Sequence, residues 1–380
     1  VDGVLVAGPD LGFGAGYPAL WENKCLGAKS WRELEAKGLA VAKPVYAAQV
    51  ALYQAHLQLH EHPALFTAIN ADSMDIYVER VPFDAALWHS DPLRLTAQGD
   101  RWVGLGVCDM KGFFPLVIEA LRGLLDQPFR QPLLVLATCD EESSMAGARA
   151  LAAAGRPLGR AAVIGEPTGL KPIRLHKGVM MERIDILGQS GHSSDPSLGH
   201  SALEAMQDVM GELRLLRAQW QREFNNPQFG VPQPTLNFGC IHGGDNPNRI
   251  CGQCALEFDL RPLPGMDPEQ LRAAIRGKLQ PLAERHQVRI DYAPLFANVP
   301  PFEQSADSEL VRVAEKLTGH AAQAVAFGTE APYLQQLGCE TIVLGPGDIA
   351  CAHQPGEFLE LARIEPTVRL LRQLIQHYCL

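Results

Sequence analysis

Asp109-Met-Lys-Gly-Phe-Phe114 is the stretch on which the architecture depends, read together with Asp140-Glu141-Glu142, Gly165-Glu-Pro-Thr168 and Ala352-His-Gln-Pro355. Each motif stands where a strand is expected to end, and an α/β sheet builds its sites at the carboxyl ends of its strands. Carboxylate oxygens bind hard divalent metals, and zinc also accepts imidazole nitrogen. One Asp, three Glu and one His therefore predict the ligands of a two-metal hydrolase, with one carboxylate left over as a general base.

Composition and charge exclude several classes of protein. The chain has 380 residues, enough for two or three domains, with 47% apolar and 20% charged residues. The absence of an 18-residue apolar run predicts no membrane span. A net charge of −10 disfavours a nucleic-acid surface. The chain opens on Val1 without a signal peptide or an initiator Met, so we expect a fragment or a processed start.

The cysteines indicate a reducing compartment. Nine cysteines, an odd number, are scattered over the chain, which predicts free thiols and a cytoplasmic location. Cys251-Gly-Gln-Cys254 has no second pair at zinc-finger spacing. We therefore expect these two thiols to be buried in strands.

Alternating strand and helix patterns predict the fold class. Residues 132–138 and 161–165 are continuous apolar runs, typical of strands that are covered on both faces of a mainly parallel sheet. Residues 176–292 predict two helices on an antiparallel sheet, which is a compact α+β insertion. Residues 293–380 return to the first sheet and end in an amphipathic helix at 363–377. The prediction is an α/β catalytic domain with an inserted α+β domain.

Several motifs in order resemble the acetylornithine deacetylase branch of the zinc aminoacylase, desuccinylase and carboxypeptidase superfamily. The resemblance spans residues 82–380 and rests on segments at Asp91-Pro92, 104–112, 140–147, 165–168 and 345–355. It implies an amide hydrolase that removes the N-acyl group of an amino acid in arginine biosynthesis. It also implies two zinc ions, with cobalt as the other candidate metal.

The resemblance assigns roles to the strand-end residues. Asp109 would bridge the two zinc ions, Glu142 and Glu166 would each bind one, and His353 would complete one site. Glu141 would be the general base. Taken alone, Glu141-Glu142 would be interpreted as an acidic surface pair; the neighbouring strand-end motifs favour the catalytic interpretation.

The same resemblance makes residues 176–292 a lid through which two chains form a homodimer. His192 would enter the partner subunit's site and stabilise the oxyanion, although a His after Gly is also common in turns. The substrate would be held by four residues, namely Asn248, Arg249, Arg261 and Thr329. Both arginines could instead form structural pairs with Asp245 and Asp259, and the sequence leaves this open.

One part of the family pattern is missing. Where the family has His-Thr-Asp-Thr-Val-Pro, this chain has Tyr77 in place of the ligand His and Glu79 in place of the Asp that orients it. One zinc keeps Asp109, Glu142 and His353, whereas the other keeps only Asp109 and Glu166. This predicts weak or absent activity.

Residues 1–81 differ from the rest of the chain. Asp2, Glu22, Lys24 and Gln49, with Tyr53 beside Gln49, resemble the carboxy-terminal half of a phage-type exonuclease of the PD-(D/E)xK class. That resemblance implies a magnesium-dependent DNA nuclease, with nucleic acid as a partner only in this alternative. Solvated strand charges and a packed Tyr are the plainer explanation.

The predicted boundaries are therefore 1–81, a nuclease-like fragment; 82–175, the first part of the zinc domain; 176–292, the lid; and 293–380, the second part of the zinc domain. The preferred function is deacetylation of an N-acyl amino acid. The alternatives are a magnesium-dependent exonuclease fragment and an inert fusion of the two parts.

Overall fold

A computed structural model describes most of the chain in two compact units. One unit comprises Val1–Pro115 with Gly347–Glu365, and the other comprises Leu116–Pro346 with Pro366–Leu380. The described residues are 3–5, 19–26, 28–42, 50, 64–70, 76–81, 94–141, 145–155, 159–352 and 356–380.

The first unit begins with a four-stranded sheet in the order β1-β2-β3-β4, where β2 and β3 are parallel. Strands β3 and β4 form an antiparallel ladder. Helix α1 buries Trp31 and Leu34. The elements are β1 (Gly3–Leu5), β2 (Ala19–Leu26), α1 (Ala28–Lys37), α2 (Leu39–Ala42), β3 (Ala64–Asn70) and β4 (Ile76–Val81).

A small antiparallel sheet in the same unit carries the loop that contains Asp109. Its strand order is β16-β6-β5, with β5 at Thr96–Gln98, β6 at Arg101–Val103 and β16 at Phe358–Glu360. Residues 104–112 follow β6 and lead into α4 (Phe113–Arg122). The loop therefore starts from a sheet that joins sequence positions about 250 residues apart.

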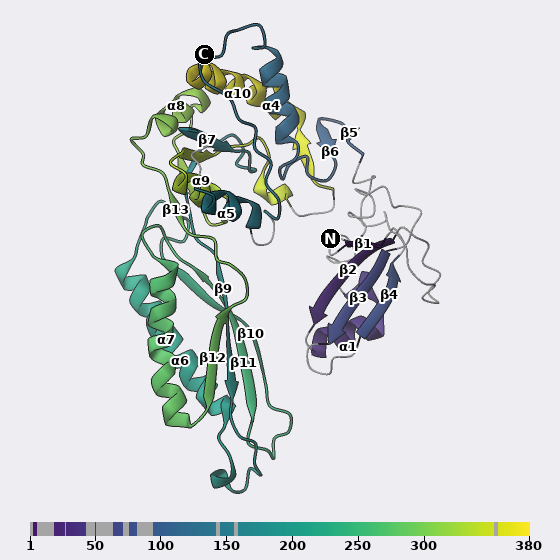
Figure 1. The fold of residues 1–380 in the computed structure, drawn as a ribbon, viewed down its shortest axis with the longest axis vertical. Helices are drawn as coiled ribbons and strands as arrows, with labels where there is room; N and C mark the ends of the chain where they lie inside the picture. The colour runs from purple at the N-terminus through teal and green to yellow at the C-terminus, as the bar shows by residue number, and fades with distance from the viewer. Residues whose placement is uncertain are drawn as a thin grey trace. The chain divides into compact units, whose positions relative to one another are not determined.

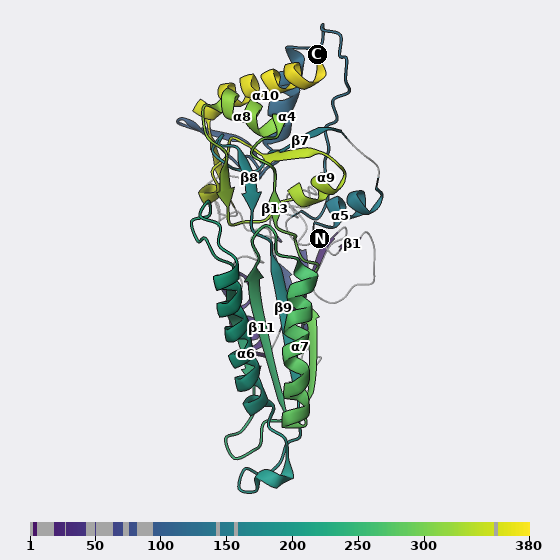
Figure 2. The ribbon, with the colours of Figure 1, turned by 90° about the vertical axis from the view of Figure 1, so that its left-hand side faces the viewer.

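The second unit contains a sheet between two helical layers (Figures 1 and 2). Its ladders are parallel for β7–β15 and β8–β14, and antiparallel for β13–β8 and β15–β8. Helices α8 and α10 pack on one side of β15, and α5 and α9 lie on the other. The elements are α5 (Ala146–Ala153), β7 (Ala161–Ile164), β8 (Ile173–His176), β13 (Phe302–Glu303), α8 (Glu309–Thr318), β14 (Gln323–Val325), α9 (Ala331–Gln336), β15 (Glu340–Val343) and α10 (Ile364–Cys379).

The predicted α+β insertion forms the other half of this unit. Four antiparallel strands lie in the order β10-β11-β9-β12, and α6 and α7 cover one face (Figure 1). Burial alternates along β9, as expected for a strand with one face in a core. The cap residues set the helix starts, because the side chains of Ser201 and Asp267 accept first-turn N–H groups. The elements are β9 (Met180–Leu187), α6 (Ala202–Glu223), β10 (Thr235–Gly243), β11 (Gln253–Arg261), α7 (Pro268–His286) and β12 (Arg289–Pro294).

The fold class is confirmed, with one correction to its strands. Residues 132–138 form no strand, and Leu134 in their middle is 58% exposed. An apolar run becomes a buried strand only beside a hydrogen-bonding neighbour, and in the described part of the chain β7 pairs with β15 alone. The prediction of a buried strand at 132–138 is therefore wrong for this structure.

Two further expectations concern thiols and membranes. Eight of the nine cysteines have described side chains, and all eight are free. Cys254 on β11 and Cys251 just before that strand are both buried, as predicted, although Cys251 is not itself in a strand. Burial raises the pKa of Cys254 to about 11. Within the described residues, every helix is too short or too polar to cross a bilayer.

Candidate active site

Asp109 lies in a loop whose backbone is held by hydrogen bonds. The Glu357 carboxylate accepts hydrogen bonds from the backbone N–H groups of Asp109 (2.9 Å), Cys108 (2.7 Å) and Gly106 (3.0 Å). Burial raises the pKa of Glu357, while these three donors act in the opposite direction. The Asp109 side chain is half-buried, and the Asp109–Met110 peptide is cis.

Glu166 follows β7 in the second unit and is 6% exposed. Its turn packs against Gly345, and the Thr168 hydroxyl accepts a hydrogen bond from the Gly345 N–H at 3.2 Å. A Cβ at position 345 would overlap the carbonyl oxygens of Gly165 and Glu166. Glu166 is thus a buried carboxylate at the carboxyl end of a strand, and its role as a metal ligand stays a prediction.

Replacing Gly345 with alanine should destabilise the Glu166 turn. The added methyl group has no room between two backbone carbonyls, so we expect the free energy of unfolding to fall by about 1–3 kcal/mol. Urea denaturation measures this. Gly277→Ala is the matched control. Gly277 is at an exposed position of helix α7 where a Cβ meets nothing within 4 Å, so this variant should be more stable by about 0.5–1 kcal/mol. Equal stabilities of the two variants would contradict the prediction.

Glu141 follows a turn of unusual backbone geometry. Asp140 has φ 59°, and its carbonyl accepts a hydrogen bond from the Met145 N–H at 2.7 Å. Thr138, just before the turn, donates its hydroxyl to Glu330 at 2.9 Å. Burial raises the pKa of Glu330. Glu141 is half-buried and directly follows Asp140 in the second unit.

The other two predicted ligands, Glu142 and His353, lie outside the described residues. Among the residues that the structure does describe, no three His, Cys, Asp or Glu side chains form a group that could bind one metal ion. The chemistry of the proposed donors, three carboxylates and one imidazole, suits zinc, and buried Glu166 supplies one of them. The complete ligand set remains a prediction.

At one end of the lid the structure brings three predicted residues together, and we call His192, Asn248 and Arg249 the tip set. His192 and Arg249 form an antiparallel bridge, and the Ser193 N–H donates to the Asn248 carbonyl at 3.0 Å. The Ser194 N–H donates to His192 Nδ1 at 3.2 Å, so the neutral imidazole carries its proton on Nε2. Arg249 pairs with Asp245 at 2.6 Å, which is the structural pairing left open by the sequence.

At the opposite end of β11, Arg261 lies near strand β8 of the mixed sheet. Arg261 pairs with Asp259 at 2.8 Å, again the structural alternative. Lys177 is 2% exposed and donates to the Gln233 carbonyl at 2.7 Å. Burial, and secondarily the charge of Arg261, lower the pKa of Lys177. Two cations therefore lie close together at the root of the lid, although Lys177 was not among the predicted site residues.

Thr329 is fully buried beside His176 at the end of β8. The Thr329 N–H donates to His176 Nε2 at 3.3 Å, and His176 Nδ1 lies 2.8 Å from the Lys177 carbonyl. The neutral ring donates from Nδ1 and accepts at Nε2. Burial lowers the pKa of His176 to about 4, so the ring stays neutral near pH 7.

Acid should weaken the fold through His176. The unfolded chain protonates this ring below pH 6.5, whereas the folded chain does so only near pH 4. The contribution of His176 to the free energy of unfolding is complete above pH 6.5. About 3 kcal/mol of it is lost as the pH falls towards 4. Urea unfolding between pH 4 and 7 should show a shallower pH dependence for His176→Gln than for the parent. Exposed His320→Gln should match the parent, and parallel curves for all three proteins would refute the assignment.

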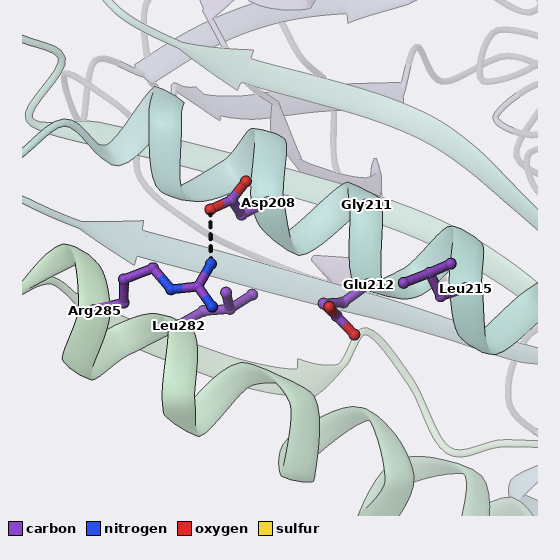
Figure 3. Close-up of a pocket in the computed structure, with 6 residues that line it drawn as sticks. All are labelled: Asp208, Gly211, Glu212, Leu215, Leu282 and Arg285. Carbon is purple, nitrogen blue, oxygen red and sulfur yellow. Dashed lines mark hydrogen bonds and ion pairs between the residues drawn. The ribbon is translucent and has the colours of Figure 1, made fainter.

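A pocket of about 310 Å³ lies on the lid between α6 and α7, away from every predicted site residue (Figure 3). Asp208 pairs there with Arg285 at 3.4 Å and lies 2.8 Å from His286 Nε2. Glu212 pairs with Lys278 outside the lining at 3.0 Å. None of the predicted site residues lines the pocket, so it takes no part in the candidate site. Its lining consists of Asp208, Gly211, Glu212, Leu215, Leu282 and Arg285.

Comparison with known proteins decides the family. A model of the peptidase family M20/M25/M40 matches residues 80–377. The chain belongs to this family. An acetylornithine deacetylase of Photorhabdus laumondii is 46% identical over 304 residues, which is 80% of this chain and 79% of the relative. An acetylornithine deacetylase of Proteus mirabilis is 47% identical over 304 residues, 80% of this chain and 78% of the relative.

Solved structures of the M20 fold agree. Aminopeptidase PepT of Bacillus cereus has a TM-score of 0.62 at 18% identity and covers 75% of this chain and 76% of its own. At this identity the likeness shows the fold alone. Similarity to M20 proteins thus confirms the fold class and the resemblance predicted for residues 82–380.

The nuclease-like residues lie before the M20 match begins at residue 80. Glu22 and Lys24 are on β2, in register with Phe66 and Ala68 of β3. Asp2 and Gln49 lie outside the described residues. The magnesium-dependent nuclease stays a prediction.

Proposed function

We propose that this M20 family member is a zinc-dependent deacetylase that hydrolyses an N-acyl amino acid of the N-acetylornithine type, a reaction of arginine biosynthesis. The observation that carries the proposal is 46–47% identity to two acetylornithine deacetylases across 80% of the chain. Glu166 also lies just beyond the carboxyl end of β7, a strand of the mixed sheet. Such positions are where α/β sheets carry catalytic groups.

Asp109, Glu142, Glu166 and His353 would bind the metal. When bound, zinc supplies a Lewis acid that polarises a carbonyl and lowers the pKa of water. The position of the first family His is Tyr77, which lies on β4. A phenol replaces an imidazole there, so we propose that one of the two metal sites is impaired.

Glu141 would move the proton. Its carboxylate accepts a proton from the attacking water as the new C–O bond forms at the acyl carbon, and the C–N bond breaks when the resulting oxyanion collapses. Glu141 then returns the proton to the departing amine nitrogen.

His192 would stabilise the oxyanion from a second subunit. Its Nε2–H is left free to donate, because Nδ1 already accepts the Ser194 N–H. The tip set and Arg261 lie at opposite ends of the nine-residue strand β11, which is about 25 Å long. One small substrate cannot contact both ends, so the tip set would serve the site of a partner chain in a homodimer.

Arg261 and Thr329, at the root of the lid, would bind the substrate of their own chain. Arg261 has a planar guanidinium suited to a carboxylate, and nearby Lys177 adds positive charge. Arg249 at the tip would act on the partner's substrate. Each arginine would exchange or share its present Asp partner on binding.

Metal analysis together with an N-acetylornithine assay tests the proposal. We expect about one tightly bound zinc per chain and turnover below that of the Proteus mirabilis relative. Two tightly bound zinc ions with equal turnover would refute the impaired site. Zinc-loaded protein that hydrolyses no N-acyl amino acid, with N-acetylornithine and its N-succinyl analogue both tried, would refute the deacetylase.

A further inference from the structure

Glu357 forms several hydrogen bonds with the backbone of the loop that contains Asp109. It is 2% exposed and immediately precedes β16. Its side-chain oxygens accept the N–H groups of Gly106, Cys108 and Asp109, and its own carbonyl accepts the Gly104 N–H at 3.0 Å. A single residue thus satisfies four backbone donors within six residues of the loop.

The loop depends on these hydrogen bonds because its backbone is not paired in the sheet. The ladder of β6 with β16 ends at Val103, and backbone donors beyond it need other partners. Gly106 has φ +79°, and a Cβ on Gly112 would overlap the Val107 carbonyl oxygen, so the turn is tight. A buried N–H left unpaired destabilises the fold, and each carboxylate oxygen can accept more than one N–H group.

A further contact ties the loop to the same distant segment of the chain. Cys108 Sγ lies 3.3 Å from the carbonyl oxygen of Asp348, nine residues before Glu357. The backbone directly before Asp109 is therefore fixed from two points of residues 348–357. The direction of the Asp109 side chain follows from that backbone.

We propose that Glu357 is a positioning residue that sets the metal affinity of Asp109 by fixing the backbone of residues 104–109. This inference rests on the proposed function for the role of Asp109 as a metal ligand. It assigns Glu357 no contact with substrate or metal. Partners that orient a metal ligand typically change metal affinity by 10–100-fold when they are removed.

The experiment compares Glu357→Gln, Glu357→Asp and the control Glu360→Gln in the full-length chain. Gln keeps the size of Glu but places an NH₂ group where one oxygen now accepts a backbone N–H. Glu360 is a carboxylate on β16, the strand that Glu357 precedes, and its ion pair is with Arg363 at 3.1 Å, outside the loop. Amide hydrogen exchange of residues 104–109 is measured on metal-free protein, and the zinc Kd by competition with a chromophoric chelator.

We expect Glu357→Gln to speed amide exchange in 104–109 at least tenfold and to raise the zinc Kd by about 10–100-fold. Glu357→Asp, which keeps the charge on a shorter side chain, should fall between Glu357→Gln and the parent. Glu360→Gln should stay within about twofold of the parent in both measurements. If Glu357 only stabilised the fold, its replacement would leave the zinc Kd unchanged at temperatures where the variant is still folded.

The inference is overturned if exchange in 104–109 is unchanged in both Glu357 variants, or if their zinc Kd equals that of Glu360→Gln. Should Glu357→Gln fail to fold, Glu357→Asp alone decides between these outcomes. Neither readout requires turnover. A parent chain that binds zinc but hydrolyses no N-acyl amino acid would therefore refute the proposed function and leave this result standing.

Discussion

Replacing Glu141 with glutamine should lower kcat for N-acetylornithine hydrolysis by a factor of about 10²–10⁴. Glutamine has the size and shape of glutamate but cannot accept the proton of the attacking water at neutral pH. Zinc content and KM should change little, because Glu141 is proposed to bind neither the metal nor the ground-state substrate. Steady-state kinetics and metal analysis of the purified variant measure both effects.

The matched control for this variant is Glu119→Gln. Glu119 is an exposed carboxylate on α4, paired with Arg122 at 3.1 Å, and it should leave kcat unchanged. A Glu141→Gln variant that keeps more than a tenth of the parent kcat would remove Glu141 from the role of general base. A variant that loses its zinc would make Glu141 a ligand instead.

Replacing Glu182 with leucine should lower the free energy of unfolding by about 3–5 kcal/mol, the largest stability effect that we expect. Glu182 is fully buried on β9, and its Oε1 accepts Nη2 of the 7% exposed Arg272 side chain at 2.7 Å. Removing the carboxylate leaves the Arg272 charge in the lid core, where Glu269 and Asn298 only partly compensate for it. Urea unfolding of the full chain measures the loss.

A double variant separates the ion pair from the packing. Glu182→Leu combined with Arg272→Met should recover much of the lost stability, because two apolar side chains leave no buried charge. Asp291→Asn, in the exposed pair with Arg289, should cost less than about 1 kcal/mol. If the double variant is no more stable than Glu182→Leu alone, buried charge is not the cause.

Much of the architecture can be predicted from local patterns in the chain. Helices α6, α7 and α8 begin next to Ser201, Asp267 and Ser308, whose side chains cap them, and such caps act within three residues. Strands β9 and β11 likewise follow from apolar periodicity. The motif around Asp109 is also local, which is why the family can be proposed from the sequence.

Contacts between distant residues decide the rest. The apolar run 132–138 reads as a buried strand, yet it is exposed because a strand needs a neighbour that its own residues cannot supply. The pairing of Arg249 with Asp245 and of Arg261 with Asp259 is open in the sequence, since an arginine can reach several carboxylates. Only the three-dimensional structure shows which carboxylate each arginine pairs with.

Glu357 shows the same limit at the candidate site. It lies four residues after His353, but its partners are backbone N–H groups 248–251 residues earlier, and backbone groups carry no signature in a sequence. Residue types and their spacing are therefore enough to name the chemistry and most of the elements of this protein. Burial, hydrogen-bond partners and the separation of the lid's two ends required the three-dimensional arrangement, because they arise between segments that are far apart in the chain.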